Sequence, residues 1–503
     1  MKKVLSGQLL EKKMDEAVSL ICGSVNPTLG PICSNALISS SLASPYITND
    51  GVTIASNVAS DDSFIEAILE IVQEAALKTN EMVGDGTTTT LVLLKAIYEQ
   101  GRKEIHQGVP KILVKKSLEE ALEKIVLAIQ RESFLPTQED LEVVGRISSN
   151  DHTISSVVCE AYSLVGHAWA IQLEESPTEE TYFIHQEGYT IDIQELPHYV
   201  VDKNKSIILK QPLIYINLQI QSLEEVENLI NECLTTHRPL CLIAETIEEE
   251  VKQKFSELAF LEHLPFYSLE VAGYTTVSFE ILEDLMHIVD ANEKHIGRVE
   301  EVHIFEDHAT FLFEPSKNIA KQIVHIKEEW KKESEKFRKE HLEMRWSLLE
   351  KGRVTIYVGG ITTPDKRERK MRFEDCIHAI LTAQKGVSLG EGLTFYKVRE
   401  KCSLEILGER ILFYALAKPF EQIMDNAGVD FSSIIKEIED SSYSKVYNFF
   451  TNQLESTASL KILDPTYVLI ESLKNAVSIA GMLLTTETLI LNEFDEKKKN
   501  IEI

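Results

Sequence analysis

Hydrophobic residues recur at helical spacing in the first hundred residues of the chain. Residues 8–25 and 63–79 carry this pattern, and the apolar run 91–97 continues a helix that opens at the threonine run 87–90. The pattern therefore predicts that the first quarter of the chain is mainly helical.

The pattern changes from about residue 182 to residue 311. Short β-rich runs, such as 206–218 and 238–246, alternate there with helical segments at 223–234 and 247–261. This alternation predicts an α/β unit. Helical character returns from about residue 373 to the end.

A strongly charged stretch, 316–351, follows the α/β unit. Its apolar residues fall at spacings of four, three and four, which predicts a helix with one apolar stripe. The stripe is short, so a surface helix resting on the α/β unit is favoured over a free coiled coil. The residues of the stripe are Ile319, Ile323, Ile326 and Trp330.

Gly188 and Gly352 lie at the two edges of the α/β unit. Glycine accommodates large backbone rotations better than any other residue, although a single glycine is usually only a turn. Because the two lie at opposite edges of one block, we predict that they form a pair of hinges.

Length and charge limit the possible classes of protein. A chain of 503 residues exceeds what one hydrophobic core usually organises, so several structural units are expected. Hydrophobic residues make up 44% and charged residues 26%, which is ordinary for a globular protein. The net charge of −29 repels phosphate backbones and anionic lipid, so neither nucleic acid nor membrane is expected as a partner.

The start of the chain and its cysteines favour a cytoplasmic location. Ser6, Gly7 and Gln8 interrupt the first apolar stretch, unlike a signal peptide, and no uninterrupted apolar run approaches the roughly 18 residues that span a bilayer. The cysteines are scattered without a Cys-x-x-Cys pair, so we expect reduced, mostly buried thiols. They are Cys22, Cys33, Cys159, Cys233, Cys241, Cys376 and Cys402.

The segment Gly84-Asp85-Gly86-Thr87-Thr88-Thr89-Thr90 is the strongest chemical signal. A helix start offers unpaired N–H groups and a positive dipole end, which attract phosphate, and threonine hydroxyls add donors. Asp85 supplies a hard oxygen ligand for Mg²⁺ beside that phosphate. A threonine-rich cap with an adjacent turn explains one or two of these residues, and phosphate binding explains the whole segment better. The sequence has no P-loop motif here.

Two other glycine turns are less specific. The segment 26–31, Asn-Pro-Thr-Leu-Gly-Pro, ends the first helix, and taken alone it is a helix stop. The segment 47–53 contains Asp50-Gly51, which is typical of a hairpin, so an ordinary turn is the better solitary interpretation.

The three segments together resemble the nucleotide-binding signature of chaperonins. TLGP (28–31), TNDGVTI (48–54) and GDGTTTT (84–90) occur in the order of that family. Two segments of the carboxyl half, 358–392 and 463–490, are similar to the GroEL type, or group I. The resemblance implies a multidomain chaperonin fold, α/β and mainly α. Its implied parts are a helical equatorial domain (1–131 and 386–503), a small intermediate domain (132–187 and 353–385) and an α/β apical domain (188–352).

The resemblance also implies roles for individual residues. Asp85 would bind Mg²⁺, Asp375 would act as the base toward the γ-phosphate, and Asp50 would help to order the attacking water. Tyr199, Val200 and Ile230 would contact clients in the apical domain. Residues matching nucleotide contacts are Thr28, Leu29, Gly30, Pro31, Gly86, Thr87, Thr88, Thr89, Ser148, Asn150, Gly390, Gly392, Asn448 and Asp464. The implied ligands are ATP and Mg²⁺, with K⁺ as an optional further ion.

The sequence departs from the family pattern near the nucleotide. Ile32 and Cys33 replace the usual Lys-Gly, and Glu391 is the middle residue of a loop that normally has three glycines. Glu391 adds a side chain and a negative charge, so we expect reduced affinity or turnover, with binding retained because Asp50, Asp85 and Asp375 are present.

A second departure concerns the apical groove, whose apolar surface captures clients in this family. Helix 223–234 has one apolar stripe and an acidic outward face, and helix 247–261 also has only one apolar stripe. Polar residues stand where the family has groove residues, and Glu195 stands where an aromatic is usual. The polar positions are Glu224, Glu225, Glu227 and Asn228 in the first helix and Lys252, Ser256 and Glu257 in the second.

Two functions remain open from the sequence. The first is an ATP-dependent folding chaperonin in stacked heptameric rings of itself, with hydrolysis coupled to hinge closure and with unfolded proteins as clients. The second is a specialised chaperonin-like binding or scaffold protein with weak ATPase activity and a narrow, basic partner. Whether a co-chaperonin binds stays open. A metabolic kinase is disfavoured, because no acceptor pocket is indicated.

Overall fold

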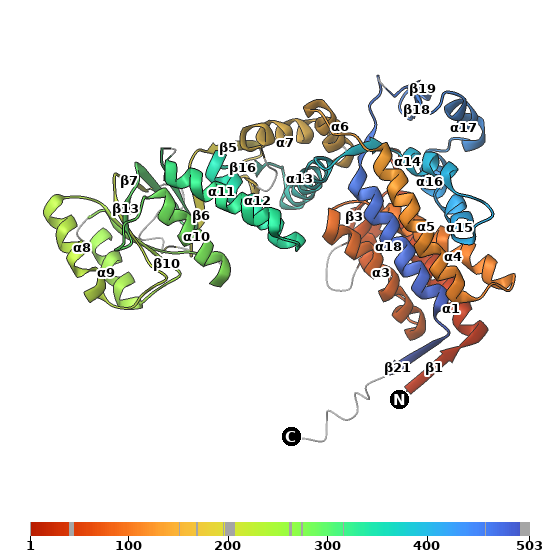
Figure 1. Cartoon of the computed structure of the whole chain (residues 1–503), viewed down its shortest axis with the longest axis horizontal. Coiled ribbons are helices and arrows are strands. Elements are labelled where there is room, and N and C mark those ends of the chain that lie inside the picture. The colour runs from red at the N-terminus through yellow and green to blue at the C-terminus, as the bar shows by residue number, and fades with distance from the viewer. Residues whose placement is uncertain are drawn as a thin grey trace. The chain divides into compact units, whose positions relative to one another are not determined.

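The chain forms two compact units, each of which we describe by itself. Unit 1 comprises Met1–Cys159 and Met371–Ile503, and unit 2 comprises Glu160–Lys370 (Figure 1). Both boundaries fall inside the predicted intermediate domain, whose own bounds stay a prediction. The computed structural model describes residues 2–39, 45–149, 151–166, 170–194, 196, 207–260, 264–272, 275–314, 316–457 and 459–492.

Unit 1 is mainly helical, as predicted. Its helices, including α7 and α13 that cross the unit boundaries, are α1 Gly7–Val25, α2 Gly51–Asn57, α3 Ser63–Val83, α4 Thr87–His106, α5 Lys111–Glu132, α6 Gln138–Ser149, α7 His152–Val165, α13 Thr363–Ala383, α14 Leu393–Val398, α15 Leu407–Ala415, α16 Lys418–Asn426, α17 Phe431–Asp440 and α18 Thr466–Thr485. Its strands are β1 Lys2–Ser6, β2 Ala36–Ile38, β3 Tyr46–Thr48, β17 Val387–Leu389, β18 Lys445–Asn448, β19 Gln453–Ser456, β20 Leu463–Pro465 and β21 Thr488–Asn492.

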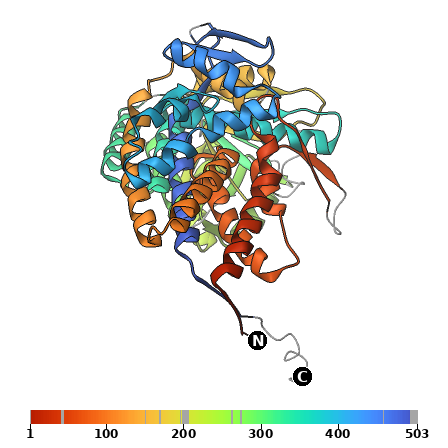
Figure 2. The ribbon, with the colours of Figure 1, turned by 90° about the vertical axis from the view of Figure 1, so that its right-hand side faces the viewer.

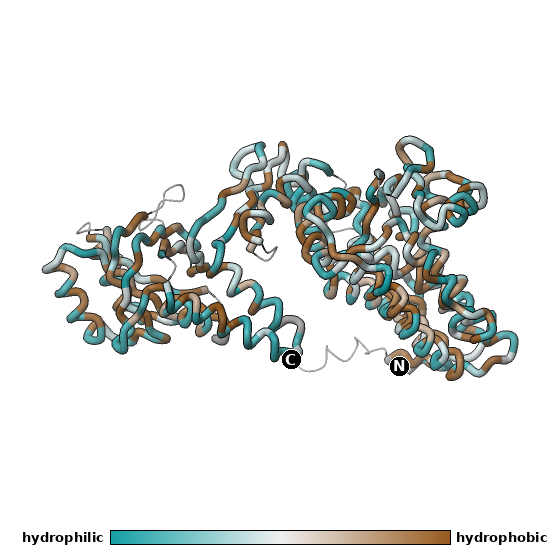
Figure 3. Tube along the Cα trace, turned by 45° about the horizontal axis from the view of Figure 1, so that its top comes forward, coloured by the Kyte–Doolittle hydropathy of each residue, from teal (hydrophilic) through white to brown (hydrophobic). Residues whose placement is uncertain are grey.

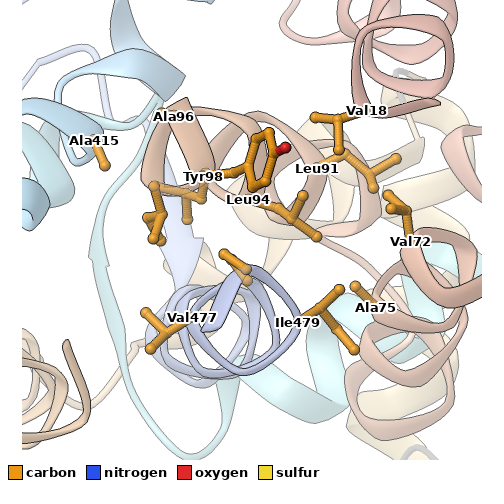
Figure 4. Packing of buried hydrophobic residues seen from close by; sticks show 14 of the residues in the cluster. Val18, Val72, Ala75, Leu91, Leu94, Ala96, Tyr98, Ala415, Val477 and Ile479 are labelled. Atoms are coloured by element: carbon orange, nitrogen blue, oxygen red, sulfur yellow. The ribbon is translucent and has the colours of Figure 1, made fainter. Parts of the chain in front are cut away.

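Helix α18 is the centre of the unit 1 core. It packs against α3, α4 and α5, and its Ile479 lies beside Ala75 of α3, in the same apolar cluster as Leu94 of α4 and Val477 on the other side of α18 (Figure 4). Helix α18 is long and apolar enough to cross a membrane by length and composition, yet 78% of its most apolar window is buried in the protein. A core helix passes the same test, and the burial explains its apolar composition.

Local signals fix where the helices of unit 1 begin and end. Asp62 caps α3 by accepting hydrogen bonds from the N–H groups of Phe64 (2.9 Å) and Ile65 (3.3 Å). Gly84 ends α3 in the left-handed conformation, with φ +69°, and its N–H bonds to the carbonyl of Asn80 at 2.7 Å. The predicted helices 8–25, 63–79 and 87–97 correspond to α1, α3 and α4.

Two small sheets extend from unit 1. Strand β1 pairs antiparallel with β21, so segments from the two ends of the chain lie side by side (Figure 2). Strand β2 pairs antiparallel with β3, with Leu37 opposite Ile47. Each sheet has two strands among the described residues, so both outer edges of each sheet lack a strand partner.

Unit 2 is an α/β unit, as predicted. Its strands are β4 Ile171–Glu175, β5 Tyr182–Gln186, β6 Tyr189–Asp192, β7 Ile207–Lys210, β8 Leu213–Ile216, β9 Gln219–Ile220, β10 Leu240–Ala244, β11 Thr246–Ile247, β12 Phe266–Glu270, β13 Ile296–Arg298, β14 Glu301–Ile304, β15 His308–Leu312 and β16 Arg353–Val358. Its helices are α8 Leu223–Thr236, α9 Glu249–Phe260, α10 Thr275–Ile288, α11 Lys317–Lys332 and α12 Lys336–Lys351.

The strands of unit 2 form three main sheets. Strands β8, β10 and β12 are parallel, with β13 antiparallel at the edge next to β8. A second, antiparallel sheet has the order β6-β15-β14-β7, and a third has the order β4-β16-β5. The parallel core and its helices explain why the sequence alternates between strand and helix patterns.

Strand β10 shows how the sheet is covered on both faces. Leu240 and Leu242 pack with α8 and α9, whereas Cys241 and Ile243 pack with α10, α11 and α12. Both faces are therefore apolar, which is why the run at 238–246 has no polar face. Figure 3 shows hydrophobic and hydrophilic residues alternating along the helices, as expected for helices with one buried face.

The charged stretch 316–351 forms two helices, α11 and α12, where the sequence predicted one. The chain leaves the helical conformation at residues 333–335 between them, and the predicted apolar stripe lies on α11. Ile319 and Ile326 of this stripe are buried, so the prediction that it rests on the α/β unit is confirmed. Residues 333–335 contain neither glycine nor proline, so no strong stop signal marks the break between the helices.

A buried ionic network holds α12 against α10. Arg345 donates two hydrogen bonds to Asp284, from Nε at 2.9 Å and from Nη2 at 2.7 Å. Glu280 contacts Arg338 and lies 2.7 Å from His341. Burial opposes ionisation of Glu280, but the hydrogen bonds of His341 and Arg338 and the charge of Arg345 outweigh it and lower its pKa to about 2.

The two predicted hinge glycines lie next to each other in unit 2. Both have positive φ, +108° at Gly188 and +76° at Gly352, and a Cβ on Gly352 would lie 2.3 Å from the carbonyl oxygen of Gln186 and 3.2 Å from that of Gly188. The backbones approach too closely for a side chain at Gly352. The hinge role itself stays a prediction.

All seven cysteines are free, and five of them are buried.

Candidate functional site

The start of α4 is an uncapped helix N-terminus. Gly86 precedes the helix with φ +82°, and no side chain there accepts a hydrogen bond from the first N–H groups. Thr87, Thr88 and Thr89 supply these N–H groups and carry hydroxyls beside them. The arrangement offers several donors and a positive dipole end to an anion.

Two polar side chains of α18 hold the start of α4 in place. Ser472 donates a hydrogen bond to the carbonyl oxygen of Gly86 at 3.2 Å, and Asn475 donates one to the hydroxyl of Thr79 at 2.9 Å. The hydroxyls of Thr79 and Thr90 lie 3.0 Å apart. These polar contacts inside the core hold the ends of α3 and α4 in place.

Asp50 and Gly51 place a second helix start beside the first. The carboxylate of Asp50 accepts hydrogen bonds from the N–H groups of Val52 (3.2 Å) and Thr53 (2.8 Å) and caps α2. A Cβ on Gly51 would lie 2.5 Å from Oγ1 of Thr88, so only glycine allows this approach. The interpretation of Asp50-Gly51 as a hairpin turn was wrong: Asp50 is a helix cap, because aspartate accepts from the first N–H groups as readily as it initiates turns.

Most of the predicted nucleotide contacts line one pocket in unit 1, with a volume of about 730 Å³. The pocket brings together segments that are far apart in the sequence: the glycine turns at 26–31 and 47–53, the start of α4, the end of α6, and parts of the carboxyl half. The predicted residues that line it are Thr28, Leu29, Gly30, Pro31, Asp50, Asp85, Gly86, Thr87, Thr88, Thr89, Ser148, Asp375, Gly392, Asn448 and Asp464.

Three carboxyl groups interact across this pocket. Burial, followed by the negative charges of Asp85 and Asp50, raises the pKa of Asp375 to about 8. Asp85 remains accessible through the pocket, yet the surrounding protein and the charge of Asp50 raise its pKa, against the effect of its hydrogen bond from the Gly86 N–H. The mutual repulsion favours a cation among these groups.

Another carboxyl group lies where β17 pairs with β20. Asp464 of β20 is opposite Ser388 of β17, and burial followed by the charge of Asp85 raises its pKa to about 7. The backbone N–H of Glu391 donates a hydrogen bond to this carboxyl group. Strand pairing therefore sets the distance between Asp464 and the loop at residues 390–392.

The match to a family model decides the class of protein. A model of the TCP-1/cpn60 chaperonin family matches residues 21–177 and 200–493. The chain belongs to this family. The resemblance to GroEL-type chaperonins drawn from the motifs is confirmed, and so is the chaperonin fold. The function that comes with the family is that of a molecular chaperone.

Two crystal forms of one solved chaperonin have the same fold as this chaperonin. They contain gp146 of bacteriophage EL 2 (Pseudomonas aeruginosa), crystallised in the presence of ATP-BeFx. The TM-scores are 0.76 and 0.68, with 22% sequence identity and with 98% of this chain and 99% of that chain covered. The likeness therefore concerns the fold along nearly the whole chain.

Two predicted nucleotide contacts, Gly390 and Asn448, already make other contacts within the protein. Gly390 does not line the pocket. Its N–H bonds to the carbonyl of Ile462 at 2.9 Å, and a Cβ there would lie 2.9 Å from Oδ1 of Asp464. The amide of Asn448 is used inside its own hairpin, where Oδ1 accepts from the N–H of Phe450 at 2.9 Å and Nδ2 donates to Glu455 at 2.8 Å.

Three predicted site residues lie outside the described residues: Asn150, a predicted nucleotide contact, and Tyr199 and Val200, two predicted client contacts. Glu195 lies outside them too. Ile230 is half-buried and packs against the apolar cluster between α8, α9 and the sheet. Its role in client binding stays a prediction.

The pocket also contains residues that the sequence did not single out. Arg146 and His152 line it from α6 and α7, and Phe450 lines it with a side chain that is 77% exposed. Lys461 lines it too and is paired with Asp140 at 2.8 Å. Arg146 lies two residues before Ser148, a predicted nucleotide contact, and this closeness in the sequence is the signal that could have identified it. Phe450 carried no such signal.

The residues present fit a magnesium ion, which this family implies. Mg²⁺ prefers one or two carboxylates and completes its octahedral shell with water and phosphate oxygens. Asp85 and Asp50 provide such carboxylates beside the helix start, and no group of three or more His, Cys, Asp or Glu ligands exists among the described residues. A site of this kind would depend on the phosphates of a bound ligand.

Gly86→Ala tests whether the helix start depends on glycine. A Cβ there would lie 2.5 Å from Oγ of Ser472 and 2.6 Å from Cγ1 of Val468, in a backbone with φ +82°. We expect a loss of about 3 kcal/mol, because overpacking adds to the cost of positive φ. Thermal unfolding and hydrogen exchange of the first turn of α4 measure it.

Gly108→Ala is the matched control, since Gly108 follows α4 with φ +98° and has nothing within 4 Å of a new Cβ. It should lose only about 1 kcal/mol. Equal losses in the two variants would contradict the packing role of Gly86.

Proposed function

We propose that this chaperonin binds ATP with Mg²⁺ and hydrolyses it while assisting protein folding. The observation that carries the proposal is one pocket that joins an uncapped helix start to a cluster of carboxyl groups. The helix start and its threonines suit the phosphates, and the carboxyl groups suit a divalent cation and a proton transfer. ATP-BeFx in crystals of a chaperonin with the same fold supports the choice of nucleotide.

Asp375 is the proposed base. Burial and the charges of Asp85 and Asp50 raise its pKa to about 8, so its carboxylate is a stronger base than an ordinary aspartate once a cation beside it has favoured ionisation. A bound Mg²⁺ supplies positive charge that neutralises developing charge on the phosphates. Asp50 lies close enough to raise the pKa of Asp375 and is the proposed group for orienting water.

The position of Asp375 supports coupling of hydrolysis to domain movement. Asp375 lies on α13, which begins at Thr363 in unit 2 and ends at Ala383 in unit 1. Ser148 of α6 donates a hydrogen bond to the carbonyl oxygen of Asp375 at 3.1 Å. Asp375 and the pocket both belong to unit 1, so a rotation between the units would move the carboxyl group only by shifting α13, the helix that the two units share.

Asp375→Ala tests the base. We expect ATP affinity to stay within about threefold and ATP hydrolysis to fall about 100-fold or more, the usual contribution of a positioned acid or base. Phosphate release and calorimetric titration measure the two quantities. Glu374→Gln, at the exposed neighbouring position, is the control and should hydrolyse ATP at the parent rate. Equal rates in parent and Asp375→Ala would remove Asp375 from this role.

Exposed strands support assembly through the two small sheets of unit 1. Leu37 is 70% exposed, Ile47 66%, Val4 61% and Ile490 56%. Exposed edges with apolar side chains are templates for pairing with another chain. Chaperonins assemble as rings, and for this chain we assign these sheets to the contact between neighbouring subunits, in stacked heptameric rings.

Ile47→Asp tests the assembly. We expect sevenfold rings for the parent protein in negative-stain images and isolated subunits for the variant, because a charge would be buried at the contact. Val324→Asp is the control, since Val324 is 56% exposed on α11 in unit 2. Intact rings of Ile47→Asp would exclude this contact.

A specialised client range is the second candidate. Val226, Leu229 and Cys233 of α8 are buried against the sheet, which leaves Glu224 and Glu227 on the exposed face. Helix α8 therefore has the single apolar stripe and the acidic outward face that its sequence predicts. An acidic surface favours basic clients over generally apolar ones.

Aggregation of denatured model proteins tests the client range. We expect suppression of a basic client and little suppression of an acidic one, and we expect Glu224→Lys combined with Glu227→Lys to reduce the effect on the basic client severalfold. Glu328→Lys, on the exposed face of α11, is the control for added charge. Capture of both clients as efficiently as by an ordinary chaperonin would end this proposal.

A further inference from the structure

Glu391 adopts a backbone conformation that favours glycine. It lies between Gly390 and Gly392, directly after β17, and has φ +56°. A residue with a Cβ loses free energy in this left-handed region, and such strain often accompanies a functional role. The position therefore invites a functional explanation for the side chain.

The carboxyl group of Glu391 has an unused hydrogen-bonding atom. The residue lines the pocket, and its Oε2 is buried without a hydrogen-bond partner among the described residues. A buried polar atom without a partner costs free energy, so a bound ligand that supplies the partner gains affinity. The pocket thus contains a group that is prepared for a polar contact.

The loop that carries Glu391 borders an apolar part of the pocket. Leu389 and Ile462, on either side of the Gly390 hydrogen bond, pack in one cluster with Leu460 and Phe449. Leu460, Ile462, Phe449 and the exposed ring of Phe450 all line the pocket. Aromatic and apolar side chains favour a flat heterocyclic base, whereas the helix start favours phosphates.

We propose that Glu391 binds the amino edge of an adenine base and so selects the nucleotide by its base. This inference rests on the proposed ATP binding. It differs from the expectation that Glu391 weakens binding by adding a negative charge and a side chain.

The protonation state of Glu391 matches adenine. Burial, followed by the charge of Asp464, raises the pKa of Glu391 well above its ordinary value and favours the neutral acid. A neutral carboxyl group has one O–H donor next to one acceptor, whereas an ionised one has acceptors only. Adenine presents its amino donor beside a ring-nitrogen acceptor on either edge, so it complements the neutral acid.

A cycle of protein variants and nucleotide analogues tests the contact. Calorimetry in Mg²⁺ compares ATP with purine riboside triphosphate, which lacks the amino group, and with 2′-deoxy-ATP, which lacks a sugar hydroxyl. The parent protein should bind ATP about tenfold more tightly than purine riboside triphosphate, the worth of one or two net hydrogen bonds. Glu391→Gly should bind these two ligands equally, at the weaker affinity.

Two further variants separate the contact from a structural effect. Glu391→Gly suits the positive φ and should fold at least as well as the parent. Glu391→Gln keeps a donor beside an acceptor and should retain most of the preference for ATP. Glu70→Gln, at an exposed position on α3, should leave every affinity unchanged.

Each outcome decides between the proposals. A preference for the amino group that persists in Glu391→Gly would overturn the inference, and so would a loss that follows the sugar hydroxyl instead. ATP binding by the parent without any preference for the amino group would overturn it as well. No binding of ATP by the parent protein would overturn the proposed function, and the inference with it.

Discussion

The packing of α18 against α3 and α4 is the interaction on which the pocket depends. This helix is apolar almost throughout, yet Ser472 and Asn475 direct two hydrogen bonds to the loop and helix that precede the threonine run. Apolar burial stabilises the bundle, and the two polar side chains determine where its helices begin and end. The geometry of the proposed phosphate site thus follows from core packing at one end of the bundle.

Much of the fold could be predicted from the sequence, because helical periodicity in unit 1 and strand–helix alternation in unit 2 follow from which faces are buried. The break between α11 and α12 could not be predicted, since neither glycine nor proline marks it. Asp-Gly occurs in both hairpins and helix starts, so the sequence alone does not separate them; the hydrogen bonds from the N–H groups of Val52 and Thr53 to Asp50 do. The resemblance named most of the pocket residues, while Phe450 required the tertiary structure.

The charges of the pocket show why composition alone misleads. Asp50, Asp85, Asp375 and Asp464 gather where a polyanion is proposed to bind, which a count of charges would disfavour. The raised pKa values of Asp85, Asp375 and Asp464 mean that protons already offset part of the repulsion. A divalent cation would take over that task, so binding of the ligand, the metal and protons must be linked. Burial and the charge of Asp464 raise the pKa of Glu391 in the same way, so a proton offsets the repulsion there as well.

The order of the pocket segments along the chain has a consequence for biosynthesis. Unit 2 is one continuous segment, so it can fold as soon as residue 370 has left the ribosome. Unit 1 must wait for α18, because α3, α4 and α5, which pack against it, expose apolar surface until that helix arrives. During that interval the nascent amino-terminal third is vulnerable to aggregation, and a chaperonin of this design itself depends on protection while it is being made.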